Sequence, residues 1–221
     1  MRALGRISNR TAYTEAGLFF AVSLVAAFLA PQEAQLGGWV RLTIWHGMLK
    51  WACIVGIFGM GVLAAAFLAT GRRALFDWAH TMQITLLPIW LFAVAIGAIA
   101  AKLVWNGWNL GERRMIMSVA YIVVAAVAVI VGLVFERPKL TSALVILTSV
   151  SMAVGLWWVE TAPPGQDVHP QNAVGGSQLP FQIFAGLMFL TCLVWVLALC
   201  VPVHRWIAKH DREAEGTAAL L

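Results

Sequence analysis

Charged residues are scarce in this sequence: Asp, Glu, Lys and Arg make up only 11% of 221 residues, whereas 61% are hydrophobic. Soluble domains carry roughly 25% charged residues, so the composition excludes a chain that faces water over its whole surface. The mean hydropathy of +0.83 agrees with this conclusion. A hydrocarbon core is crossed by about 20 apolar residues, and the chain has several such stretches. We therefore expect an integral membrane protein.

Reactive motifs are also lacking. The only cysteines are Cys53, Cys192 and Cys200, and none belongs to a CxxC pair, which argues against thiol redox chemistry and a disulfide framework. The sequence contains no zinc motif, P-loop, nucleophile elbow or paired-carboxylate arrangement. These absences count against a hydrolase or an ATPase.

Charge-poor runs predict an all-α integral membrane fold, a bundle of six transmembrane helices in one domain that spans residues 1–221. The predicted helices are 12–31, 42–71, 75–102, 113–135, 140–160 and 179–207. Pro88 should kink the third helix. All connections except 160–178 are short, so consecutive helices should pack antiparallel.

Basic residues predict the orientation, because they stay on the cytoplasmic side. With both termini in the cytoplasm, ten of the fifteen Lys and Arg residues lie on that side: Arg2, Arg6, Arg10, Arg72, Arg73, Arg137, Lys139, Arg205, Lys209 and Arg212. The Pro31-Gln-Glu segment is a poor cleavage site, so the first helix is expected to be uncleaved. Anionic lipid headgroups account for the net charge of +5, and no nucleic-acid partner is expected.

Six of the tryptophans fall at the expected outer helix ends or in outer connections. They are Trp39, Trp45, Trp105, Trp108, Trp157 and Trp158. Two interpretations stay open: an interfacial aromatic belt, or a surface on which a flat ligand stacks just above the bilayer.

His46 is the main functional candidate, about one turn into the second helix. Lys50 follows four residues later on the same helical face. Ionisable groups within a span usually face the bundle interior or a cavity, so the imidazole could ligate iron and the ammonium could pair with a propionate or another anion. In the alternative interpretation, His46 hydrogen-bonds a backbone carbonyl and Lys50 extends outward to the interface.

Other polar positions are less specific. His80 and Gln83, three residues apart on the third helix, suit either a second polar site, for a quinone or a second heme, or hydrogen bonds between helices. His204 is expected to be solvated. Met152, on the fifth helix, is either an iron ligand or packing filler.

Three segments carry a family resemblance. The segment RLTIWHGMLKW places His46 at the outer start of the second helix, KLVWNGWNLGERR supplies Trp105 and Trp108 before the fourth, and SMAVGLWWVET holds Met152 ahead of Trp157-Trp158. Their order resembles the cytochrome c assembly family of CcmC/CcsA-type heme-handling membrane proteins. Those proteins have a histidine at the place of His46, a tryptophan-rich segment between the third and fourth helices, and a second histidine where this chain has Met152.

The resemblance implies a function in c-type cytochrome biogenesis, with heme b presented at the outer face of a bacterial cytoplasmic (inner) membrane. His46 and Met152 would be the iron ligands. The other cofactor-binding residues would be Trp45, Lys50, Trp105, Trp108, Trp157 and Trp158. Partners would be membrane lipid and other membrane or periplasmic cytochromes or redox proteins. An alternative stays open, in which a relative without lyase activity serves as a membrane anchor subunit of a respiratory or electron-transfer complex.

Overall fold

The computed structural model describes residues 9–30, 38–108, 110–161 and 179–218. Its six helices are α1 (Asn9–Leu29), α2 (Val40–Thr70), α3 (Arg73–Trp105), α4 (Arg113–Phe135), α5 (Pro138–Glu160) and α6 (Leu179–Ala218). All six are long and apolar enough to cross a membrane. The all-α prediction and the six spans are therefore confirmed. The largest difference in bounds is at α6, which continues past the apolar stretch because Lys, Arg, Glu and Ala favour helix.

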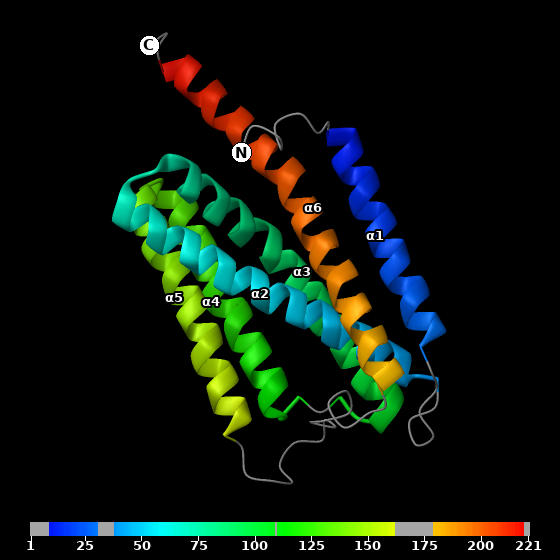
Figure 1. The fold of residues 1–221 in the computed structure, drawn as a ribbon. Coiled ribbons are helices and arrows are strands. Elements are labelled where there is room, and N and C mark those ends of the chain that lie inside the picture. The colour runs from blue at the N-terminus through cyan, green and yellow to red at the C-terminus, as the bar shows by residue number, and fades with distance from the viewer. Residues whose placement is uncertain (1–8, 31–37, 109, 162–178, 219–221) are drawn as a thin grey trace.

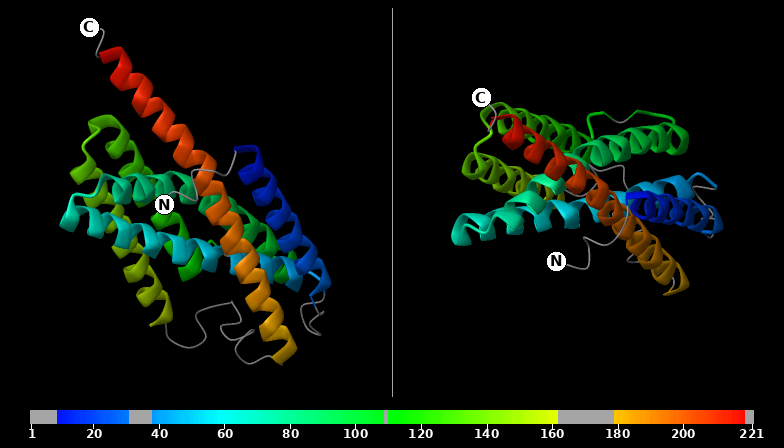
Figure 2. Two further views of the ribbon diagram at one scale, coloured as in Figure 1. Left: turned by 45° about the horizontal axis from the view of Figure 1, so that its top comes forward. Right: turned by 90° about the horizontal axis from the view of Figure 1, so that it is seen from above.

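The α2–α3 hairpin lies at the centre of the bundle (Figure 1). The α4–α5 hairpin packs on one side of it, whereas α6 and α1 pack on the other. In Figure 2, α6 crosses the central hairpin, and α1 lies alongside α6. Between them, α2 and α3 contact all four of the other described helices.

Successive helices run in opposite directions, as the short connections predicted (Figure 1). The N-terminal end of α2 and the C-terminal end of α5 therefore lie at one end of the bundle, which we call the tryptophan end because Trp39, Trp108, Trp157 and Trp158 belong to it. The start of α1 and the end of α6 lie at the opposite end. The placement of the tryptophan end outside the cell stays a prediction.

Two glycines allow α2 to approach its neighbours closely. A Cβ added to Gly56 would lie 3.0 Å from Leu86 of α3, and one added to Gly61 would lie 2.7 Å from the Cβ of Ser149 on α5. The Ser149 hydroxyl donates to the Ile57 carbonyl across the same contact, at 2.8 Å. Small residues are used in this way where membrane helices pack without a hydrophobic driving force.

Candidate functional site

A cavity of about 130 Å³ lies at the tryptophan end, lined by residues of α2, α3, α4 and α5. We call it the Lys50 cavity. Three residues predicted from the sequence line it: His46, Lys50 and Trp108. His46 and Lys50 come from one face of α2, whereas Trp108 comes from the connection after α3. The structure thus brings together the expected imidazole, the expected cation and one of the expected indoles.

The ring of His46 is held in one orientation. His46 is only 7% exposed, and its Nδ1 lies 2.7 Å from the Ala93 carbonyl oxygen of α3. A carbonyl oxygen can only accept a hydrogen bond, so Nδ1 carries the proton and donates, which leaves the basic lone pair on Nε2. A Cβ added to Gly97, one turn further along α3, would lie 2.7 Å from Nε2, so the ring fills the space that the missing side chain leaves.

Lys50 turns into the bundle instead of extending outward. Its Nζ donates to the Ser118 hydroxyl oxygen on α4 at 2.7 Å and lies 5.0 Å from the centre of the Trp90 ring on α3. Ser118 in turn donates its proton to the Arg114 carbonyl at 2.6 Å, so its oxygen is available as an acceptor. The ammonium therefore joins α2, α3 and α4, and a cation–π contact supports it.

Charged residues that sequence reasoning did not single out complete the cavity. Glu112, Arg114 and Glu160 line it beside Thr43. An Arg114 guanidinium nitrogen lies 3.6 Å from a carboxylate oxygen of Glu160. The sequence does hold a signal for these residues, since Glu112-Arg-Arg stands directly before an apolar run. Two cations at the start of a helix oppose the helix dipole, so their position suggests a second role.

The predicted tryptophans divide into two groups. Trp108, Trp157 and Trp158 are exposed at the tryptophan end, and the Arg113 guanidinium lies 5.2 Å from the Trp158 ring centre. Trp45 is buried instead and points away from the cavity lining toward α1. Trp105 is the last residue of α3, but its side chain lies outside the described part of the chain.

Trp45 ties α1 to the central hairpin. Its indole Nε1 donates to the Ser23 hydroxyl at 3.0 Å, and its ring packs edge-on against Phe20 of α1 and Phe92 of α3.

Trp45→Phe is expected to destabilise the protein by about 1 kcal/mol, because it removes one buried hydrogen bond while keeping an aromatic ring. Unfolding by SDS titration would measure the change, with Trp157→Phe at an exposed site as the control. Equal stability of the two variants would contradict a role for the hydrogen bond.

Met152 is fully buried within the core, and it does not belong to the lining of the Lys50 cavity. The methionines that do line the cavity are Met115 and Met117. His46 and Met152 are therefore not brought together in this cavity. Among the described residues, no three His, Cys, Asp or Glu side chains gather in a way that could hold a metal ion.

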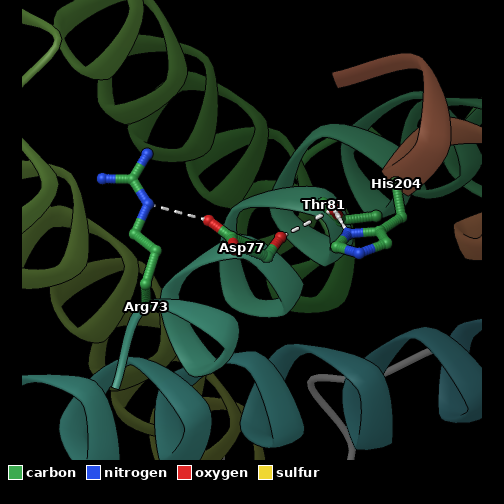
Figure 3. Close-up of polar contacts among 4 residues, drawn as sticks. All are labelled: Arg73, Asp77, Thr81 and His204. Atoms are coloured by element: carbon green, nitrogen blue, oxygen red, sulfur yellow. Dashed lines mark hydrogen bonds and ion pairs between the residues drawn. The ribbon is translucent and has the colours of Figure 1, made fainter. Parts of the chain in front are cut away.

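A second polar cluster lies at the opposite end of the bundle and links α3 to α6 (Figure 3). Thr81 donates its hydroxyl proton to the Asp77 carbonyl at 2.7 Å, so His204 Nδ1, 3.0 Å away, must donate to the Thr81 oxygen. Arg73 Nε donates to the Asp77 carboxylate at 3.0 Å. His204 also stacks on Trp78, with ring centres 4.4 Å apart. The expectation that His204 is solvated was wrong, because the flat imidazole packs on an indole.

The two other polar residues that the sequence singled out on α3 are His80 and Gln83. His80 stacks on Phe76 with ring centres 5.7 Å apart. Gln83 is buried, and both polar atoms of its amide lack a hydrogen-bond partner within the described ranges. Thr81, between His80 and Gln83 in the sequence, makes a hydrogen bond from α3 to α6.

The chain matches no known protein-family model, and comparison with curated proteins finds no sequence match. The likeness to the CcmC/CcsA-type proteins therefore rests on the order of His46, the two tryptophan segments and Met152 along the chain.

Proposed function

We propose that the protein is a heme-handling membrane protein of c-type cytochrome biogenesis, with heme as its cargo at the outer face. The observation that supports the proposal is the convergence of His46, Lys50 and Trp108 on one cavity. In this proposal the tryptophan end faces the outside of a bacterial inner membrane, and both termini are cytoplasmic, as the count of basic residues suggests. Partners would be membrane or periplasmic cytochromes and redox proteins.

The residues present fit part of this role. A histidine whose Nδ1–H donates to a backbone carbonyl is in the tautomer that iron-ligating histidines use, with Nε2 as the ligand. Met152 does not fit as the second ligand, because it lies outside the cavity lining. The volume of about 130 Å³ is also well below the roughly 300–1,000 Å³ of ordinary ligand pockets. The proposal therefore requires most of the porphyrin to lie outside the cavity, where Trp108 and Trp158 are exposed, with only its iron within reach of His46.

A heme-loading experiment tests the proposal. Purified protein that has been incubated with heme and then separated from unbound heme is expected to show a Soret band. His46→Ala should abolish or strongly shift it because the ligating imidazole is gone. The control is His204→Ala, which removes an imidazole at the opposite end of the bundle and should leave the band unchanged. An identical spectrum for wild type and His46→Ala would contradict the assignment of His46 as an iron ligand. The absence of a Soret band in wild type would contradict the proposed function.

A second candidate function is a non-enzymatic anchor subunit of a respiratory or electron-transfer complex. The observation that favours it is the packing of the His46 ring on Gly97, which gives the histidine a purely structural use. Purification in mild detergent distinguishes the two functions. A stable, stoichiometric complex with redox subunits and no Soret band of this chain supports the anchor, whereas heme on the isolated chain supports the heme-handling function.

A further inference from the structure

Thr43, Lys50 and Arg114 line the Lys50 cavity and carry hydrogen-bond donors for which the structure shows no acceptor among the described residues. The Thr43 hydroxyl and Arg114 Nε are buried, and neither has a hydrogen-bond partner among the described residues. Lys50 carries three N–H donors, of which Ser118 accepts one. These donors come from α2 and α4 and line the same cavity. An unpaired buried donor is costly, so their convergence indicates a site built for a ligand rich in acceptors.

We propose that the Lys50 cavity binds a carboxylate group, with Thr43, Lys50 and Arg114 as its donors. A carboxylate offers two oxygens and about four acceptor sites and can take several N–H and O–H donors at once. The cavity of about 130 Å³ suits a small acid or the carboxylate end of a longer amphiphile. The proposal goes beyond heme handling and does not depend on it, because it requires no iron ligand.

The acidic residues at the cavity define the charge balance. Glu160 pairs with one guanidinium nitrogen of Arg114, and the carboxylate of Glu112 lines the same cavity as Lys50. A bound carboxylate therefore competes with Glu112 for the charge of Lys50. Neutralising Glu112 should tighten the binding of an anion and weaken the binding of a cation. The direction of the change in affinity therefore shows whether the cavity prefers an anion.

Gly47 lines the cavity but has no side chain that would occupy it. It lies between Thr43 and Lys50 on the same face of α2 and belongs to the lining. A Cβ added to Gly47 would meet no atom within 4 Å. A larger side chain at this position is therefore expected to extend into the cavity from an unobstructed Cβ, and the substitution removes none of the donors.

The experiment is calorimetric titration of the heme-free protein in neutral detergent with sodium propionate, its neutral analogue propionamide, and decanoate. Propionate is expected to bind, whereas propionamide is not. Lys50→Met and Gly47→Leu should each weaken propionate binding about tenfold or more, since a hydrogen bond to a charged group is lost or its space is filled. Glu112→Gln should tighten binding several-fold. Gly186→Leu, at an α6 glycine that also has no atom within 4 Å, is the matched control and should bind as wild type does.

Comparison of propionate with decanoate shows whether the carboxylate belongs to a small acid or to a membrane amphiphile. Equal affinity for propionate and decanoate identifies a small water-borne acid, whereas much tighter binding of decanoate identifies a membrane amphiphile; both support the proposal. Equal binding of propionamide and propionate, wild-type affinity in Gly47→Leu, or weaker binding in Glu112→Gln would each overturn it. So would the failure of both acids to bind. A Soret band can appear or be absent under each of these outcomes, so the heme proposal is tested separately.

Discussion

Gly97→Ala is expected to destabilise the protein by about 2–3 kcal/mol, although Gly→Ala within a helix ordinarily stabilises by about 0.5–1 kcal/mol. The new methyl group would lie 2.7 Å from His46 Nε2 and 2.9 Å from Nδ1. The ring has no simple way to move aside, because Nδ1 is hydrogen-bonded to the Ala93 carbonyl one turn away on the same helix. The helices α2 and α3 must therefore separate or the hydrogen bond must break. SDS-induced unfolding would measure the loss.

A double-mutant cycle assigns the effect to the ring. In a His46→Ala background, Gly97→Ala should cost little, because the methyl group then enters the space that the imidazole leaves. Gly186→Ala, where a Cβ meets nothing within 4 Å, is the control and should be neutral or stabilising. If Gly97→Ala is as stable as Gly186→Ala, the close packing of α2 on α3 at this point is contradicted.

Gly61→Ala is expected to cost about 2 kcal/mol through the contact between α2 and α5. The added Cβ would lie 2.5 Å from the Ser149 hydroxyl oxygen and 2.7 Å from its Cβ. Ser149 is held in place because its hydroxyl donates to the Ile57 carbonyl at 2.8 Å and to the Val145 carbonyl at 3.1 Å. The same unfolding assay would report the change as a lower midpoint.

A matched glycine lies two residues away. Gly59→Ala would approach only the flexible end of Met82, at 3.6 Å, so it should be neutral or slightly stabilising. Ser149→Gly combined with Gly61→Ala should recover much of the loss, because it removes both atoms that the methyl group meets. Equal stability of Gly59→Ala and Gly61→Ala would show that α2 and α5 do not pack as closely as described.

The six helices could be predicted because a membrane span is recognised from the length and composition of an apolar run alone. The runs after Arg73 and Arg113 are long, apolar and nearly free of charge, and both are helices in the structure. The end of α6 at Ala218 was not predicted, since the helix there continues through polar residues and no longer follows hydrophobicity. Orientation in the membrane depends on charge counts and stays a prediction.

The rotation of each helix about its axis could not be predicted, because a helix that is apolar all round gives no periodic signal. Trp45 and His46 are neighbours in the sequence, yet about 100° of rotation separates them. As a result, Trp45 contacts Ser23 of α1, whereas His46 contacts Ala93 of α3. The resemblance implied that Met152 lies beside His46 as an iron ligand, but the order of residues along the chain does not determine which face of α5 carries Met152.

The sequence predicted only some of the residues that line the Lys50 cavity. Spacing placed Lys50 on the His46 face, and both line the cavity. Arg114 and Glu112 come from α4 and its N-terminal cap, so their approach depends on how α4 packs on the central hairpin, and no local pattern records it.

Because synthesis proceeds from the N-terminus, α1 is inserted before α6. In the folded protein α1 packs mainly on α6 and only slightly on α2. Most of the packing surface of α1 therefore lies against lipid until α6 has been synthesised and inserted. The contact between α1 and α6 joins the two described helices that are farthest apart in the sequence. It forms only after α6 has been inserted, so it distinguishes a chain that contains α6 from one truncated before it.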